Sequence, residues 1–133
     1  MKLITIKENH LFGKAYAKGK RFSGRTVSVY VLKDYAAGRI RKMLQKDKVE
    51  NRYGISVSKK VGGAVERNRG KRVIRAGLYS VLSKNTVKGG SLVVLSVRTA
   101  AVDAKSTDAE KDIFTAFCRL GLIERTEGGN ASV

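Results

Sequence analysis

The chain has 133 residues and a formal net charge of +17, from 28 Lys and Arg against 11 Asp and Glu. This charge indicates a polyanionic partner. Nucleic acid is favoured over a membrane surface, because the sequence has neither a basic amphipathic helix with bulky apolar anchors nor a lipidation motif. One Cys and one His exclude an intramolecular disulfide and a Cys/His zinc site. No signal peptide follows Met1 and no apolar run approaches the ~20 residues of a membrane span, so we expect a cytoplasmic protein.

The positive charge is concentrated in the first three quarters of the chain. Residues 1–102 contain 24 basic and 5 acidic side chains, whereas residues 103–133 contain 4 basic and 6 acidic ones. We therefore expect the binding surface to be built from the first 102 residues. An apolar content of 42% is enough for one modest core. It predicts a single domain over residues 1–125, followed by a disordered tail over residues 126–133.

The N-terminal third predicts a helix and a strand. Residues 9–18 carry apolar side chains at helical spacing between a candidate cap, Asn9, and a terminating Gly19. Residues 22–32 alternate strictly, which predicts a strand with a valine face and a wetter, partly aromatic face. Residues 33–51 lose this pattern; the mixed run over residues 39–50 could form a frayed helix or an exposed hairpin, and we interpret the whole segment as a mobile basic connection.

The middle of the chain predicts a strand, a glycine turn and a long helix. Residues 53–58 alternate like a strand, the Gly62–Gly63 pair ends it, and a helix is expected over residues 64–83. Gly70 and Gly77 each cost roughly 1 kcal/mol relative to Ala inside a helix, so we expect them to allow close approach to the sheet. At ~100° per residue, the helix has a polar sector (Arg67, Asn68, Lys71, Arg72, Arg75) and an apolar sector (Gly70, Val73, Ile74, Gly77, Leu78, Val81).

The last quarter predicts one more strand and one more helix. Residues 91–97 form an almost continuous apolar run, typical of a central strand buried on both faces. A capping box over residues 107–110 predicts the start of a helix that ends at Gly121. The order helix, strand, strand, helix, strand, helix predicts an α/β fold, a two-layer α/β sandwich with its helices on one main face of a small sheet.

Groups suited to catalysis are scarce in this sequence. It has no Ser/His/Asp or Cys/His set, which argues against a hydrolase encoded by the protein alone. Asp108 and Asp112 lie at i and i+4 on the last helix and could share Mg²⁺, but acids near a helix N-terminus are expected simply to complement the helix dipole. The Gly70–Lys71 pair lacks a following Ser or Thr and lies inside a predicted helix, so it does not support a P-loop. We predict no catalytic residue and no metal ligand.

The densest positive run, residues 52–75, contains eight basic residues and one acid, Glu66. A row of like charges along a helix repels itself, so it should persist only where a polyanion neutralises it. Phe12 and Tyr16 share one face of the first helix, and Tyr30 lies on the wetter strand face. Core packing explains the first two rings as well as base stacking does. Arginines that bind phosphates and rings that stack on unpaired bases together predict RNA as the partner.

Three segments of the sequence resemble the bacterial ribonuclease P protein family. They are GISVSKKVG at residues 54–62, AVERNRGKRVIR at residues 64–75 and KENHLFGKAYAKGKRF at residues 7–22. The resemblance extends over about residues 3–125. It implies a two-layer α/β sandwich with a small four-stranded-type sheet and a left-handed crossover, a fold similar to domain 2 of ribosomal protein S5.

The resemblance also implies a function. Members of this family bind a large catalytic RNA and help it remove the 5′ leader from precursor tRNA, while the RNA performs the Mg²⁺-dependent phosphodiester hydrolysis. The protein is then a subunit of an endoribonuclease, without catalytic residues, a tightly bound cofactor or a protein partner of its own. The implied contacts are Lys59, Lys60, Arg67, Asn68, Arg69, Lys71, Arg72 and Arg75 to the RNA subunit, and Phe12, Tyr16, Thr26, Ser28 and Tyr30 to the leader.

Two other functions fit the same composition. A ribosomal protein or general RNA chaperone would use the basic surface to stabilise RNA without assisting any cleavage. A self-sufficient protein nuclease would cleave precursor tRNA without an RNA subunit. The helix that follows SVSKKVG favours the ribonuclease P subunit over the first alternative. Activity on precursor tRNA without any RNA subunit would support the second.

Overall fold

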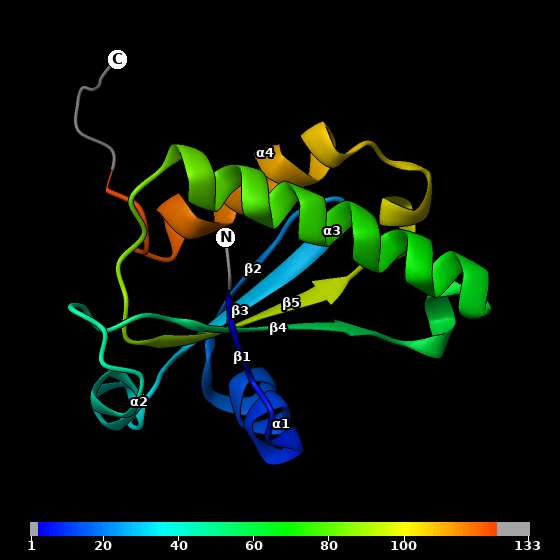
Figure 1. The fold of residues 1–133 in the computed structure, drawn as a ribbon. Helices are drawn as coiled ribbons and strands as arrows, with labels where there is room; N and C mark the ends of the chain where they lie inside the picture. Colours follow the sequence, from blue (N-terminus) through cyan, green and yellow to red (C-terminus); the bar gives the residue numbers. More distant parts are fainter. Residues whose placement is uncertain (1–2, 125–133) are drawn as a thin grey trace.

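The computed structural model describes residues 3–124 and places a mixed sheet between helices on its two faces (Figure 1). None of the helices in this range is long and apolar enough to cross a membrane. Within these residues the helices are α1 (Asn9–Lys18), α2 (Ala37–Met43), α3 (Ala64–Lys84) and α4 (Ser106–Arg119), the strands are β1 (Ile4–Thr5), β2 (Lys20–Ser23), β3 (Val27–Lys33), β4 (Arg52–Val57) and β5 (Ser91–Val97), and two short 3₁₀ turns are η1 (Lys59–Val61) and η2 (Thr99–Asp103).

The sheet has the strand order β1-β4-β5-β3-β2. β4 is parallel to β1 and to β5, whereas β3 is antiparallel to β5 and to β2. α3 connects the parallel neighbours β4 and β5. β5 lies at the centre, and residues 92–95 are buried on both faces, as their apolar composition predicts. This arrangement is an α/β sandwich, extended at one edge by the two-residue β1, which is too short to give a periodic signal in the sequence.

The strand predicted over residues 22–32 is wrong in one respect, because the structure has a hairpin there. β2 and β3 pair in an antiparallel register that sets Ser23 opposite Ser28. The turn between them is closed by a hydrogen bond from the Gly24 amide to the Val27 carbonyl, 2.8 Å long. The alternation of polar and apolar residues stops at this turn, where residues 23–26 are Ser, Gly, Arg and Thr, and the prediction of one strand overlooked this turn signal.

Two hydrophobic cores lie on opposite faces of the sheet. The larger core joins the sheet to α3 and α4 and contains the fully buried Ile74, Leu78 and Phe117. The smaller core joins the other face to α1, with Ala15 packed against Leu92 and its neighbours. Helices were expected on one main face, but the apolar stripe of α1 also needs cover. α1 therefore packs on the face opposite α3 and α4 (Figure 1).

The two glycines of α3 permit close packing against two different elements. A Cβ on Gly70 would lie 2.8 Å from Cγ1 of Val97 on β5, so this glycine brings the helix onto the sheet as predicted. A Cβ on Gly77 would lie 2.8 Å from Cβ of Ala109, so the second glycine instead brings α3 onto α4. The two contacts hold α3 against β5 and against α4, and the polar sector of α3 faces solvent.

Residues 33–51 are not an unpatterned connection, because they contain the short helix α2. Asp34 begins the segment, and its carboxylate accepts a hydrogen bond from the Ala36 amide at 3.0 Å. The segment carries the exposed side chains of Tyr35 and Met43. α2 has few apolar residues and two charged ones in its last turn, so its sequence gives almost no amphipathic signal.

α4 begins at Ser106, near the predicted start, but its cap differs from the predicted box. The Asp108 carboxylate accepts a hydrogen bond from the Lys105 amide at 3.0 Å, two residues earlier than the box over residues 107–110 would place it. Glu110 forms an ion pair with Lys84 of α3 instead. The tail predicted to be disordered, residues 126–133, lies outside the described residues.

Candidate nucleic-acid interface

The basic run continues from β4 through η1 into α3, and its glycine turn is built around Glu66. Gly62 has φ +143°, a conformation that suits glycine. The Gly63 amide donates a hydrogen bond to Oε1 of Glu66 at 2.9 Å. The one acid of the run thus satisfies a free amide at the N-terminus of α3 and complements the helix dipole. It forms no ion pair with the cations around it within residues 3–124.

The eight predicted contacts to the RNA subunit lie on two consecutive elements, η1 and the first half of α3, and we call this set of residues the docking face. η1 presents two exposed lysines, and the first half of α3 presents Asn68, Arg69, Arg72 and Arg75 to solvent, with Arg67 and Lys71 half-buried. Among the described residues, none of its seven cations forms an ion pair. The docking face consists of Lys59, Lys60, Arg67, Asn68, Arg69, Lys71, Arg72 and Arg75.

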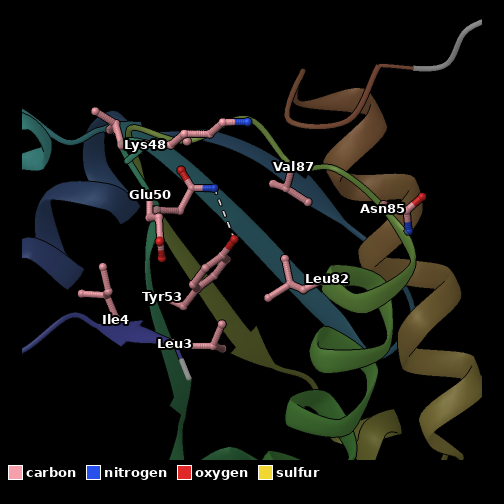
Figure 2. Close-up of a pocket in the computed structure, with 11 residues that line it drawn as sticks. Leu3, Ile4, Lys48, Glu50, Tyr53, Leu82, Asn85 and Val87 are labelled. Carbon is pink, nitrogen blue, oxygen red and sulfur yellow. Dashed lines mark hydrogen bonds between the residues drawn. The ribbon is translucent and has the colours of Figure 1, made fainter. Parts of the chain in front are cut away.

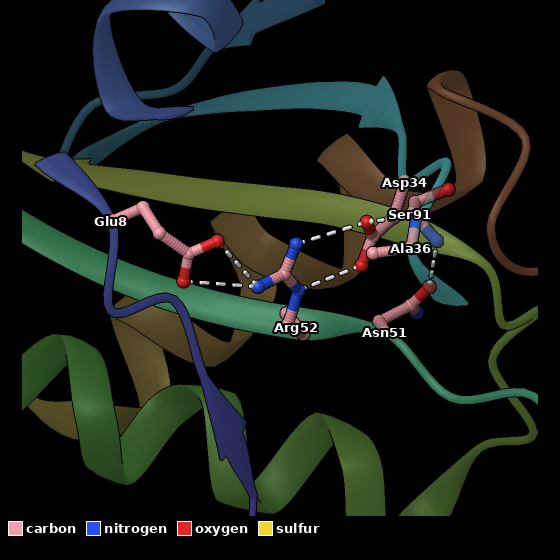
Figure 3. Close-up of polar contacts among 6 residues, drawn as sticks. All are labelled: Glu8, Asp34, Ala36, Asn51, Arg52 and Ser91. Carbon is pink, nitrogen blue, oxygen red and sulfur yellow. Dashed lines mark hydrogen bonds and ion pairs between the residues drawn. The ribbon is translucent and has the colours of Figure 1, made fainter. Parts of the chain in front are cut away.

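Arg52, the first cation of the same run, has a structural role instead. Its guanidinium donates to both carboxylate oxygens of Asp34, at 2.7 and 3.0 Å, and to Glu8 at 3.1 and 3.3 Å (Figure 3). Arg52 is only 7% exposed and Asp34 only 5%. Hydrogen bonding to Asp34 raises the pKa of Arg52, and hydrogen bonding to Arg52 lowers the pKa of Glu8. These bonds join β4 to the residues that precede α1 and α2.

An aromatic pair lies on the sheet face beside α1. The rings of Tyr16 on α1 and Tyr30 on β3 meet edge to face, with 4.9 Å between their centroids. The hydroxyls of Tyr16 and Ser56 on β4 are hydrogen-bonded at 2.5 Å. Tyr16 is 42% exposed, so part of its ring is available to a ligand. The structure therefore brings two of the predicted leader contacts together on one surface.

Phe12 contributes to the same face from one turn earlier on α1. A Cβ on Gly54 would lie 2.5 Å from Cζ of Phe12, so the ring occupies the space that a side chain on β4 would fill. Phe12 is half-buried and packs against the smaller core. The core-packing interpretation of this ring is thus supported, and Phe12 packs against the same core cluster as Tyr30.

A row of serines, which sequence reasoning missed, crosses the sheet next to the tyrosines. Ser56, Ser96, Ser28 and Ser23 are successive partners across β4, β5, β3 and β2. The hydroxyls of Ser23 and Ser28 are hydrogen-bonded at 3.0 Å. Only Ser28 was singled out in the sequence, because the row depends on strand register. With Phe12, Tyr16 and Tyr30, these four serines form what we call the aromatic surface.

Thr26 does not belong to the aromatic surface, contrary to the prediction. It is 1% exposed, and both its amide and its hydroxyl donate hydrogen bonds to Oδ2 of Asp112 on α4, at 2.8 and 2.5 Å. Thr26 lies in the hairpin turn rather than in β3, so the strand alternation that placed it beside Ser28 does not apply to it. Asp112 is accordingly occupied in holding the hairpin to α4. No group of three or more His, Cys, Asp or Glu side chains that could hold a metal ion occurs within residues 3–124.

Comparison with known proteins gives a consistent result. The model of the family described as ribonuclease P matches residues 1–121. The ribonuclease P protein component of Clostridium acetobutylicum is 40% identical over 123 residues, which cover 92% of this chain and 93% of that protein. The structure of the Staphylococcus aureus RNase P protein superposes with a TM-score of 0.67 at 27% identity, covering 92% of this chain and all of that one. The RNase P protein of Thermotoga maritima, at 18% identity and a TM-score of 0.62, supports the fold alone.

These relatives decide between the functions that the composition left open. Each is a ribonuclease P protein, and nothing among them favours a ribosomal protein or an RNA chaperone. The chain therefore belongs to the ribonuclease P protein family and serves, with an RNA subunit as its partner, as the protein subunit of the endoribonuclease that matures the 5′ end of tRNA.

Proposed function

We propose that the two surfaces divide the work of this subunit: the docking face binds the RNA subunit, and the aromatic surface binds the single-stranded 5′ leader of precursor tRNA. The observation that carries the first assignment is the absence of any ion pair to the seven cations of the docking face within residues 3–124. Unpaired Lys and Arg side chains on η1 and on the first half of α3 suit the phosphates of a folded RNA, where Arg binds in a bidentate manner.

The assignment of the leader is supported by the chemistry of the aromatic surface. Unpaired bases stack on exposed tyrosine rings without strong sequence preference, and a leader must vary in sequence from one tRNA to another. The serine row beside the rings supplies hydroxyl groups that can donate to phosphates or accept from riboses. The aromatic surface carries hydroxyls rather than carboxylates, so it offers no general base for hydrolysis. We therefore assign the Mg²⁺-dependent cleavage to the RNA subunit.

The substitution Tyr30→Ala tests the leader assignment. It removes one ring of the edge-to-face pair. Loss of one stacked base costs roughly 1–3 kcal/mol, so the assembled holoenzyme should bind precursor tRNA about 5- to 150-fold more weakly while its affinity for mature tRNA stays unchanged. The measurement is equilibrium binding of both tRNAs to the same holoenzyme preparation.

The matched control is Tyr35→Ala, which removes a tyrosine that is 80% exposed on the α2 segment. This variant should bind both tRNAs like the wild type. If Tyr30→Ala weakens precursor and mature tRNA equally, or weakens neither, the aromatic surface does not bind the leader.

A further inference from the structure

A pocket that was not predicted from the sequence, although two predicted RNA contacts line it, lies between α3 and the β1 edge of the sheet. Its volume is about 320 Å³, and its lining includes Thr5 on β1, Tyr53 and Ile55 on β4, and Lys71, Arg75 and Tyr79 on α3. Pockets that hold small ligands measure roughly 300–1,000 Å³, so the space suits a group the size of one nucleotide. A neighbouring pocket, which shares Leu3 and Tyr53 with it, continues along the same edge toward the end of α3 (Figure 2).

The α3 wall of this pocket is a single stripe of the helix. Lys71, Arg75 and Tyr79 stand at i, i+4 and i+8, so they follow one another along the same side. The pocket has two cations in its lining and no acid. Neither cation forms an ion pair within the described part of the chain. The wall therefore offers positive charge without an internal counter-ion, which suits an anionic group such as a phosphate.

Apart from Thr5, the rest of the lining is apolar and aromatic. Tyr53 is buried, and burial raises the pKa of its phenol, so this residue stays neutral and its ring contributes an apolar surface. Tyr79 is 36% exposed at the rim, where its ring can be covered by a planar group. A bare phosphate would use only the cations, whereas a nucleotide would use both the cations and the ring. Both halves of the lining are thus explained by one ligand.

The pocket is also continuous with the docking face. Lys71 and Arg75 belong to both, so an RNA backbone that follows the docking face passes the mouth of the pocket. An acidic peptide could pair with the two cations, but it would not use the tyrosine at the rim, and its docking would compete with the RNA for the same side chains. The charge and this continuity favour RNA.

We propose that this pocket receives one unpaired nucleotide of the RNA subunit, with its phosphate on Lys71 and Arg75 and its base stacked on Tyr79. The inference rests on the proposed role of the docking face, because it takes the RNA bound there as the source of the nucleotide. The nucleotide acts as an anchor that fixes where along the RNA the protein sits. Single-stranded and bulged nucleotides, whose bases are free to leave the helix, are the class of ligand that the pocket fits.

Tyr79→Ala tests the stacking half of this proposal in the full chain, with a transcript of the RNA subunit as the probe. The affinity of the variant for the transcript should fall about 5- to 150-fold, the range measured for loss of one stacked base. The slope of log K against log salt should stay the same, because no phosphate contact is removed. Tyr79→Phe keeps the ring and should retain most of the affinity. Arg75→Ala should instead reduce the slope by about one unit.

A second substitution tests the pocket without changing any α3 side chain. Thr5→Glu places a carboxylate in the lining and should weaken transcript binding at least tenfold, whereas Thr115→Glu, which adds the same charge at an exposed position of α4, should change it less than twofold. Thermal unfolding followed by circular dichroism checks that each variant is folded.

Three results would overturn the proposal. The first is binding of Tyr79→Ala within twofold of the wild type, the second is an equal loss for Tyr79→Ala and Tyr79→Phe, and the third is an equal loss for Thr5→Glu and Thr115→Glu. The double variant Arg69→Ala/Arg72→Ala separates this failure from failure of the proposed function. If the double variant loses affinity and Tyr79→Ala does not, only the pocket is excluded, whereas if neither loses affinity, the docking face itself is wrong.

Discussion

Two kinds of cation occupy one basic run of this protein. Arg52, at its start, is buried and makes four hydrogen bonds to two carboxylates. The seven cations from Lys59 to Arg75 make no ion pair within residues 3–124. Arg52 thus joins three segments of the chain, whereas the cations of the docking face remain free to bind an anionic partner. Density of charge in a sequence therefore does not identify a binding surface, because the difference depends on whether acids elsewhere in the chain reach the cation.

The acids that neutralise Arg52 come from distant parts of the sequence. Glu8 lies 44 residues away and Asp34 lies 18 residues away, and the pairing of β1 with β4 helps to bring the first of them near. Within residues 3–124 no acid forms an ion pair with the docking face, and Glu66, the one acid of the basic run, accepts a hydrogen bond from the Gly63 amide. Removing charge from each region, and measuring stability and RNA binding separately, tests whether Arg52 stabilises the fold and whether the docking face binds RNA.

The largest effect is expected for Arg52→Met, which keeps the apolar stem and removes the charge. Breaking a buried ion pair leaves an unpaired carboxylate at Asp34, so the free energy of unfolding should fall by about 3–5 kcal/mol. Urea denaturation measures this loss. Adding Asp34→Asn should recover part of it, because the uncompensated charge is then removed. A loss below about 1 kcal/mol would show that Arg52 is not a structural cation.

The next effect is expected for Arg69→Ala/Arg72→Ala, which removes two exposed cations from the docking face. Neither side chain makes a hydrogen bond or ion pair in the described structure, so the stability should change by no more than about 0.5 kcal/mol. Hydrogen bonds to charged groups contribute about 1.5–3 kcal/mol each, so the loss of two at the lower end of this range should reduce affinity for the RNA subunit on the order of a hundredfold. The slope of log K against log salt should fall by about two units.

The control for this double variant removes the same charge elsewhere. Lys105→Ala/Lys111→Ala takes two exposed cations from the region of α4, where acids outnumber bases. Its slope should match that of the wild type. If both double variants reduce the slope equally, the RNA responds to the net charge of the protein and not to the docking face.

The long elements of the fold could be predicted because their signals are local. α3 and β5 appear in the sequence as a helical periodicity and as an apolar run, and the structure places both within one residue of the predicted bounds. The polar and apolar sectors of α3 are confirmed for the same reason. β1 was missed because two residues are too few for periodicity. The helix α2 was left as one of two alternatives because it has almost no apolar stripe.

The candidate site could be predicted only in part, because its details depend on contacts between distant segments. The residues of the docking face lie close together in the sequence, on η1 and the first half of α3, so they could be proposed from the sequence alone, and their contact with RNA stays a prediction. Thr26 was misplaced because a turn interrupts the alternation and Asp112, 86 residues later, holds the side chain. Ser56 and Ser96 were missed because only the register of three strands brings them beside Ser28. The sequence did not mark Tyr79 as a binding residue, because the pocket that it lines is formed only when β1 pairs with β4.

The smallest change in stability and in RNA binding is expected for Lys84→Ala at the far end of α3. This variant tests directly whether ion pairing within the protein separates structural cations from those that bind RNA. Lys84 is exposed like the cations of the docking face, but it is paired like Arg52, with 2.8 Å between its Nζ and Oε2 of Glu110. Exposed ion pairs contribute about 0.2–1 kcal/mol, so the free energy of unfolding should fall by no more than that, and the loss should shrink at high salt. A double-mutant cycle with Glu110→Ala isolates the pair itself. Because its charge is already neutralised, Lys84 should add nothing to the salt dependence of RNA binding. A slope that falls by one unit would mean that the docking face extends along the whole helix, and that internal pairing does not separate structural cations from binding ones.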